Sequence, residues 1–202
     1  TSSGWIVANS FTNNGGEWHC VYQEMPKPEN IDKPMEQMFK VSKLLDGKEP
    51  DTSQKFTFKM EQIGTVPQGS TKIEDINVTN NGSSIDFGKI VYTVAGDYYY
   101  KITETGKSES TSGNYNFDQT SYIAKVSVAV NSSVNGNITT NEYSSTITYY
   151  RGAEVTDCIE NNQVVDSNGI VFNNTTKQES YILPETGGIG TNRFTAMGLA
   201  LM

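Results

Sequence analysis

Short runs of alternating apolar and polar residues fill the middle of the chain, and turn-forming residues separate them. Side chains of a β-strand alternate between its two faces, so each run predicts a strand with one buried face. The runs lie at residues 38–45, 55–60, 85–94, 98–104, 121–130, 144–150 and 169–174. Residues 131–137, rich in Asn and Ser, are interpreted as a loop. No long stretch has the apolar period of a helix.

These runs predict an all-β domain at residues 36–177. Seven or so strands over about 140 residues, with no helices between them, are typical of a two-layer antiparallel β-sandwich. Residues 1–35 carry Pro and Gly turn signals and are interpreted as an extended N-terminal segment or the end of an upstream module. Residues 178–202 predict a flexible C-terminal tail, which is polar first and then small and apolar.

Three polar residues occupy positions where the alternation predicts an inward-facing apolar side chain: Lys43, Glu104 and Asn174. Each extends the inward row of its strand by one step. One interpretation is that all three lie at strand ends and reach into water, as Lys does readily. The other interpretation is that an amine, a carboxyl group and a carboxamide meet inside the core.

The second interpretation predicts a reaction within the chain. Burial lowers the pKa of Lys43 and raises the pKa of Glu104, which leaves a neutral amine beside a protonated acid. The amine is then a nucleophile, and the carboxamide carbon of Asn174 is its electrophile. We expect Glu104 to hydrogen-bond the carboxamide oxygen, polarise the carbonyl and shuttle protons. The product is an amide between Lys43 and Asn174, formed once by proximity with loss of ammonia.

Five segments around these residues are, in chain order, FKVSKLLDG, KFTFKM, GDYYYKITE, FDQTSYIAKVSV and GIVFNN. Together they resemble the isopeptide-linkage domains of Gram-positive pilins, above all the shaft pilins of streptococci, over residues 37–176. The resemblance implies an Ig-like sandwich of the CNA-B type with an autocatalytic Lys–Asn bond. It assigns the amine to Lys43, the acid to Glu104 and the amide to Asn174. Asn173 is a competitor, but strand parity favours Asn174.

The C-terminal tail resembles a sortase sorting signal of the pattern L-P-x-T-G, with a polar linker before it and an apolar stretch after it. The residues of the signal are Leu183, Pro184, Glu185, Thr186 and Gly187. The resemblance implies cleavage between Thr186 and Gly187 and transfer of Thr186 to an amine. The apolar stretch is shorter than the roughly 20 residues that span a bilayer. We therefore expect the natural signal to continue beyond residue 202.

Shaft pilins also present an acceptor lysine, and Lys27 is the best single candidate. Trp18 precedes Pro26 and Lys27 at the spacing of the family's pilin motif, but the residues between match loosely and the motif lies before the domain. This departure slightly favours an ordinary lysine in a proline-rich linker.

The chain contains two cysteines, Cys20 and Cys158, which could form a disulfide in an oxidising compartment or remain free thiols. Neither lies in a C-x-x-C motif, and a single histidine cannot complete a His/Cys zinc site with them, so we expect no metal and no cofactor.

The net charge of −8, with no basic run, argues against nucleic acid as a partner. We therefore expect a secreted structural protein of the Gram-positive cell wall and surface, of pilin type and not an enzyme. Its expected partners are sortase, peptidoglycan or neighbouring pilin subunits, and a host surface ligand. The alternative is a monomeric wall-anchored adhesin that uses the same domain as a stalk.

Overall fold

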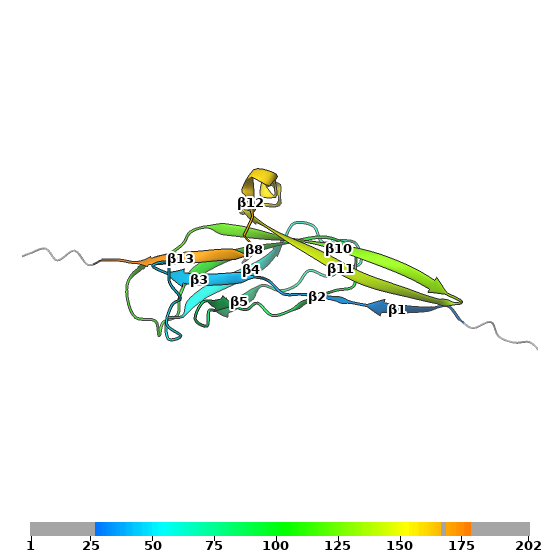
Figure 1. Ribbon diagram of the computed structural model, residues 1–202, viewed down its shortest axis with the longest axis horizontal. Helices are drawn as coiled ribbons and strands as arrows, with labels where there is room; N and C mark the ends of the chain where they lie inside the picture. Colours follow the sequence, from blue (N-terminus) through cyan, green and yellow to red (C-terminus); the bar gives the residue numbers. More distant parts are fainter. Residues whose placement is uncertain (1–26, 167–168, 179–202) are drawn as a thin grey trace, which may run out of the picture.

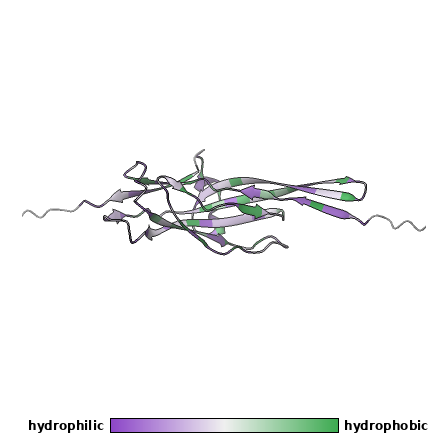
Figure 2. Ribbon diagram, turned by 90° about the horizontal axis from the view of Figure 1, so that it is seen from below, coloured by the Kyte–Doolittle hydropathy of each residue, from purple (hydrophilic) through white to green (hydrophobic). Residues whose placement is uncertain are grey.

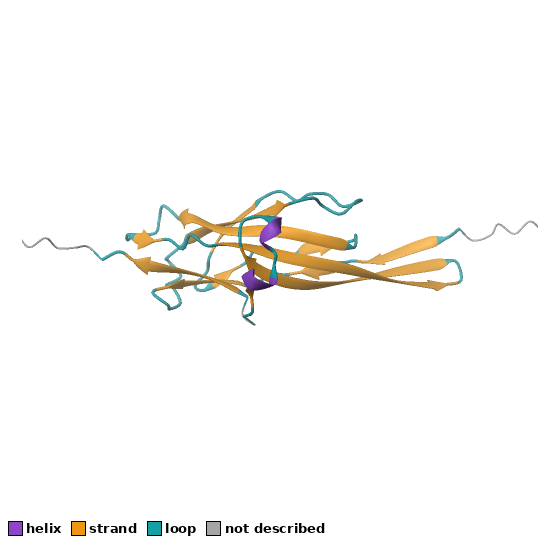
Figure 3. Cartoon of the chain, turned by 90° about the horizontal axis from the view of Figure 1, so that it is seen from above, coloured by secondary structure: helices purple, strands orange, loops and turns teal. Residues whose placement is uncertain are grey.

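The computed structural model describes residues 27–166 and 169–178. Strands make up nearly all of the regular structure, and the described helical segments are two short 3₁₀ turns, Val155–Asp157 and Glu160–Asn162 (Figure 3). None of the helices in the described ranges is long and apolar enough to cross a membrane. The prediction of an all-β sandwich is confirmed.

The larger of the two main sheets has the strand order β1-β11-β10-β8-β4-β5, with β12 added beside β11. Its strands are β1 (Glu29–Lys33), β4 (Phe56–Ile63), β5 (Ile76–Thr79), β8 (Gly96–Lys107), β10 (Ser121–Asn135), β11 (Ile138–Arg151) and β12 (Gln163–Val164).

The smaller main sheet has the order β6-β3-β13-β9, and β2 and β7 form a separate pair. These strands are β2 (Met35–Gln37), β3 (Val41–Leu45), β6 (Ser84–Ile85), β7 (Ile90–Tyr92), β9 (Tyr115–Asn116) and β13 (Ile170–Thr176). Most pairs are antiparallel, as expected. The pairs β3–β13 and β1–β11 are parallel, which is possible because in each case the two strands are far apart in sequence and a long connection joins them.

A single core fills the space between the two main sheets, and it follows the predicted alternation. β4 is buried at every second residue, and β3 is buried at Val41, Lys43 and Leu45. Aromatic side chains contribute much of the core, including Phe56, Phe58, Tyr100 and Phe172. The inward positions of Lys43 and Asn174 therefore lie among tightly packed apolar groups.

β10 and β11 extend beyond the sandwich as a long arm (Figures 1 and 2). β10 pairs with β11 from Tyr122 to Asn135, but it pairs with β8 only as far as Val128. Beyond Val128 the arm therefore consists of β10 and β11, with β1 beside β11. The prediction of a loop at residues 131–137 was wrong, because β10 continues to Asn135 and turns at Gly136. Polar residues suit a strand here because both faces of the arm are exposed.

Candidate functional site

The side chains of Lys43, Glu104 and Asn174 meet in the core between the two sheets. Lys43 Nζ donates a hydrogen bond of 2.9 Å to Glu104 Oε2, and Asn174 Nδ2 donates one of 2.5 Å to Glu104 Oε1. One carboxyl group therefore bridges the amine and the carboxamide. Lys43 and Asn174 come from neighbouring strands of the smaller sheet, and Glu104 comes from the larger sheet that faces it.

Strand parity places each of these side chains. Lys43 is paired with Phe172 in the parallel ladder of β3 and β13, and Asn174 follows Phe172 by two residues on the same face. Glu104 is the fourth inward position of β8 and is paired with Phe58 of β4. Directly after this pair the β4–β8 register shifts by a β-bulge, which ends the regular inward row at Glu104.

The site is dry. Lys43 and Asn174 are 0% exposed, and the side chain of Glu104 is likewise 0% exposed although its backbone is partly accessible. The Lys43 Nζ atom lies 4.8 Å from the centroid of the Phe56 ring. These values exclude the interpretation in which the three polar side chains reach into water at strand ends.

Burial determines the protonation of the pair. Desolvation lowers the pKa of Lys43, although its hydrogen bond and charge interaction with Glu104 act in the opposite direction. Desolvation likewise raises the pKa of Glu104 against the effects of the hydrogen bonds from Lys43 and Asn174. Both shifts favour a neutral amine beside a protonated carboxyl group, because a dry site disfavours charge.

The carboxamide is oriented differently from the sequence-based expectation. We expected Glu104 to hydrogen-bond the carboxamide oxygen of Asn174, and this was wrong: Glu104 contacts the carboxamide nitrogen. The oxygen, Asn174 Oδ1, accepts a hydrogen bond of 2.8 Å from the backbone N–H of Asp118. Asp118 was missed by sequence reasoning, because it lies in the loop between β9 and β10 and the contact uses its main chain, which no residue pattern reveals.

Asn173, the neighbouring candidate, faces the other way. It is exposed, and its Oδ1 accepts a hydrogen bond of 3.0 Å from the amide of Gly47. The structure thus brings Asn174, and not Asn173, to Lys43 and Glu104.

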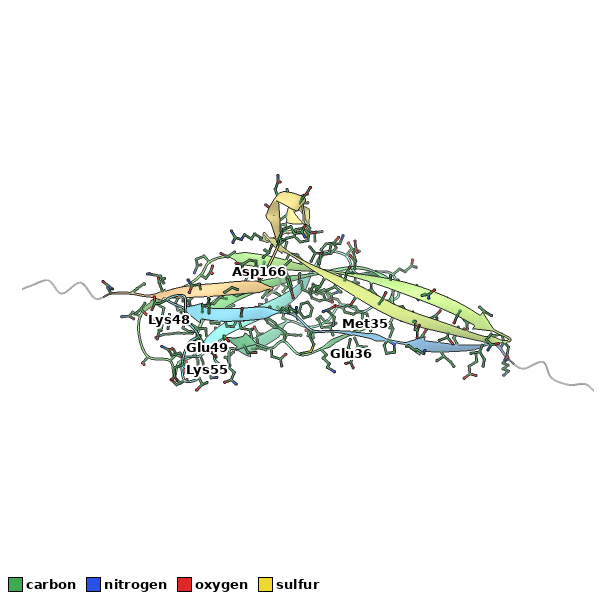
Figure 4. All side chains as sticks on the ribbon, in the orientation of Figure 1. Met35, Glu36, Lys48, Glu49, Lys55 and Asp166 are labelled. Atoms are coloured by element: carbon green, nitrogen blue, oxygen red, sulfur yellow. The ribbon has the colours of Figure 1, made fainter. Side chains whose placement is uncertain are left out.

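Another lysine also contacts an asparagine side chain, and it provides a comparison. Lys55 Nζ donates to Asn81 Oδ1 at 3.2 Å and to the carbonyl of Asn80 at 2.9 Å. Asn81 is exposed, so that pair is open to water. Figure 4 shows Lys55 near Lys48 and Glu49, at the periphery of the sandwich.

Of the other residues singled out in the sequence, Lys27 and Cys158 lie in the described part of the chain. Lys27 is exposed beside the tip of the arm, where its carbonyl accepts a hydrogen bond of 2.8 Å from Asn137 Nδ2. Cys158 is partly buried next to the first 3₁₀ turn, and Cys20, the other cysteine of the chain, lies outside the described residues. The sorting signal, residues 183–187, also lies outside them. In the part of the chain that the structure describes, no group of three His, Cys, Asp or Glu side chains could hold a metal ion.

With this geometry in view, residues 39–177 match the FctA family, the Spy0128-like isopeptide containing domain. The match covers more than half of the chain. The chain belongs to this family. Membership in the FctA family makes it a pilin-like, isopeptide-containing structural domain, in agreement with the resemblance stated above.

Three crystal structures of the major pilin from Streptococcus pyogenes, two of them of mutants, are similar to this FctA-family chain. Their sequence identities are 19–21% and their TM-scores are 0.38–0.39. The matches cover 70% of this chain and 50% of each pilin, so the chain spans about half the length of those pilins. No curated protein matches the chain.

Proposed function

We propose that this domain is a subunit module of a cell-surface pilus and that an amide bond between Lys43 and Asn174 locks it. The observation that supports the proposal most strongly is the fully buried arrangement in which Glu104 bridges the Lys43 amine and the Asn174 carboxamide. Family membership supports the same chemistry, because the family is defined by an isopeptide-containing domain.

The reaction balances without a cofactor. The neutral Lys43 amine attacks the carboxamide carbon of Asn174, and the carbonyl oxygen takes up negative charge. Protonated Glu104 gives its proton to Asn174 Nδ2, which it already contacts, and receives a proton from the Lys43 nitrogen. The intermediate collapses to the amide, ammonia leaves, and Glu104 is protonated again.

The position of the bond suits a protein under tension. β3 and β13 are the first and last strands of the smaller sheet along the chain, and their parallel pairing means that pulling on the two ends shears them past each other. The described ends of the chain lie at opposite ends of the long axis (Figure 1). A bond from Lys43 to Asn174 would carry the force directly from β3 to β13, so the segment between them would not unfold.

The decisive experiment is the intact mass of the purified protein, followed by mapping of a peptide that contains both Lys43 and Asn174. We expect a deficit of one ammonia molecule, which Lys43→Ala abolishes. Lys55→Ala is the matched control, because Lys55 also contacts an asparagine side chain, and we expect it to retain the deficit. An unmodified mass in the folded wild-type protein would sink the proposal.

We further propose that the protein is secreted, anchored to the cell wall through residues 183–187 and polymerised by sortase onto Lys27. Lys27 contacts Asn137 at the tip of the arm, and the arm lies at the end opposite to β13 (Figure 1). This placement supports the arrangement. With a complete sorting signal and a cognate sortase, we expect a ladder of covalent multimers that disappears in Lys27→Ala. Lys33→Ala is the control, since Lys33 is also exposed on the arm.

The second candidate function is that of a wall-anchored monomeric adhesin that uses the sandwich as a stalk and binds a host surface ligand. It predicts single-subunit attachment to peptidoglycan and no ladder in either variant. A ladder that persists in Lys27→Ala would instead assign the acceptor role to a different lysine.

A further inference from the structure

A backbone amide, and not the catalytic carboxyl group, faces the oxygen on which negative charge would develop. The N–H of Asp118 donates to Asn174 Oδ1 at 2.8 Å. When an amine attacks the carboxamide carbon, this oxygen becomes the oxyanion of the tetrahedral intermediate. A fixed donor at this distance in a dry site is the arrangement that stabilises such an intermediate in acyl-transfer reactions.

The same N–H determines how the carboxamide is oriented. A backbone N–H can only donate a hydrogen bond, so the group that faces it must be the oxygen of Asn174 and not the NH₂ group. The NH₂ group is therefore directed to Glu104 Oε1, where it is found. The nitrogen that must leave as ammonia thus lies against the acid that protonates it.

The side chain of Asp118 holds this amide in place. Its Oδ1 accepts a hydrogen bond of 2.9 Å from the N–H of Thr120, and its Oδ2 accepts one of 3.0 Å from the N–H of Asn173. The first bond closes the loop on itself, and the second ties the loop to the residue next to Asn174. The loop is also anchored from its N-terminal side, because β9 pairs with the end of β13.

We propose that the backbone N–H of Asp118 is the oxyanion donor for formation of the Lys43–Asn174 bond and that the Asp118 carboxylate is a positioning group for it. This inference rests on the proposed function and assigns separate roles to Asp118 and Glu104. Asp118 stabilises the charge on the carbonyl oxygen, whereas Glu104 moves protons between the attacking and the leaving nitrogen. The N–H is already aligned before the reaction, so no reorganisation is needed when the charge develops.

The test replaces the amide N–H of residue 118 by an ester oxygen, using the α-hydroxy analogue of aspartate in a semisynthetic chain. Wild-type and ester chains are prepared by the same route and refolded from denaturant, which starts the reaction. Loss of ammonia is then followed by intact mass. We expect the ester chain to form the bond about 100- to 1,000-fold more slowly, the range seen when one oxyanion donor is removed.

Two side-chain variants test the positioning role. Asp118→Ala retains the N–H but loses both acceptor oxygens, so we expect a smaller slowing than in the ester chain. Asp118→Asn retains an acceptor oxygen and should restore most of the rate. The unfolding midpoint of each substitution is also measured in a Lys43→Met background, in which no bond can form. A loss of folding stability alone would lower these midpoints without slowing bond formation.

The outcomes are distinguishable from failure of the proposed function. If the wild-type chain forms no bond, the proposed function falls. If wild type forms the bond and the folded ester chain does so within about threefold of its rate, the oxyanion role of Asp118 is overturned. If the ester disrupts the loop and the ester chain does not fold, the two side-chain variants decide. In that case, bond formation at the wild-type rate in both Asp118→Ala and Asp118→Asn overturns the positioning role of the carboxylate, and with it the inference as stated.

Discussion

Asn173 and Asn174 are neighbours in the chain, yet β13 directs their side chains to opposite sides of the sheet. Asn174 is 0% exposed and contacts Glu104, whereas Asn173 is exposed and accepts a hydrogen bond from Gly47. Two chemically identical carboxamides therefore differ only in environment, which makes them a matched pair for experiment.

The first prediction uses this pair. Asn174→Ala should abolish the deficit of one ammonia molecule in the intact mass, because the electrophile is gone. Asn173→Ala should retain the deficit, because its side chain lies outside the core. Intact-mass spectrometry of both proteins checks the prediction. A deficit that disappears in Asn173→Ala and persists in Asn174→Ala would contradict the prediction, because it would show that Asn173 forms the bond.

The second prediction concerns the pH dependence of bond formation. Burial lowers the pKa of Lys43 and raises that of Glu104, so we expect the reactive form of the pair to have a neutral amine and a protonated carboxyl group. At low pH the pair gains a second proton and the amine becomes unreactive ammonium. At high pH the pair loses its proton and no acid remains for the leaving nitrogen. The rate after refolding should therefore follow a bell-shaped pH profile.

Glu104→Gln is the control for this profile and should form no bond at any pH, because the glutamine side chain cannot shuttle protons. The prediction would be contradicted by a wild-type rate that rises steadily up to the ordinary lysine pKa of 10.5. Such a profile would mean that an unperturbed, solvated amine reacts.

The third prediction concerns the contribution of the bond to stability. It closes a loop of roughly 130 residues, and the chain-entropy estimate for such a cross-link is on the order of 5 kcal/mol. The double variant Lys43→Met/Glu104→Gln removes the bond while keeping the core filled and leaving no unpaired buried carboxyl group. We expect its free energy of unfolding to fall by about 5 kcal/mol, measured by denaturant titration.

A loss below about 1 kcal/mol, in a double variant shown by mass to be unlinked, would contradict this role for the bond. The exposed ion pair between Lys33 and Glu142 provides a reference for a small effect, because both side chains are 59% exposed. Lys33→Ala should change the free energy of unfolding by less than about 1 kcal/mol.

The fourth prediction concerns the N-terminal boundary of the domain. β1 belongs to the large sheet, but all five of its residues are exposed, so it buries little apolar surface. Deletion of residues 1–33 should therefore leave a folded domain that still forms the bond, as measured by circular dichroism and intact mass. An unfolded or unlinked product would show that β1 is required and that the predicted boundary at residue 36 lies too far along the chain.

Much of the candidate site follows from local patterns. The period of two along a strand predicts that Lys43, Glu104 and Asn174 point inward, and it separates Asn174 from Asn173. The alternation rule succeeds because the pleated backbone of a strand directs successive side chains to opposite faces, whatever lies elsewhere in the chain. The prediction of a loop at residues 131–137 failed because the rule addresses strands with one buried face, whereas the end of β10 is exposed on both faces.

The sequence by itself therefore determined the all-β class, the inward positions of the three reactive groups and six strands of the sandwich, because these depend on alternation between neighbouring residues. The six strands are β3, β4, β8, β10, β11 and β13, whereas the run predicted at residues 85–94 is divided between β6 and β7. Only the tertiary structure decided that β3 and β13 run in parallel, and that Glu104 contacts the carboxamide nitrogen while the Asp118 amide contacts the oxygen. These contacts join residues that are 56 and 70 positions apart, and the Asp118 contact is made by a main-chain group that every residue except proline carries. No pattern of side chains can specify such a contact, because only the packing of the two sheets and the loop between β9 and β10 brings the groups together.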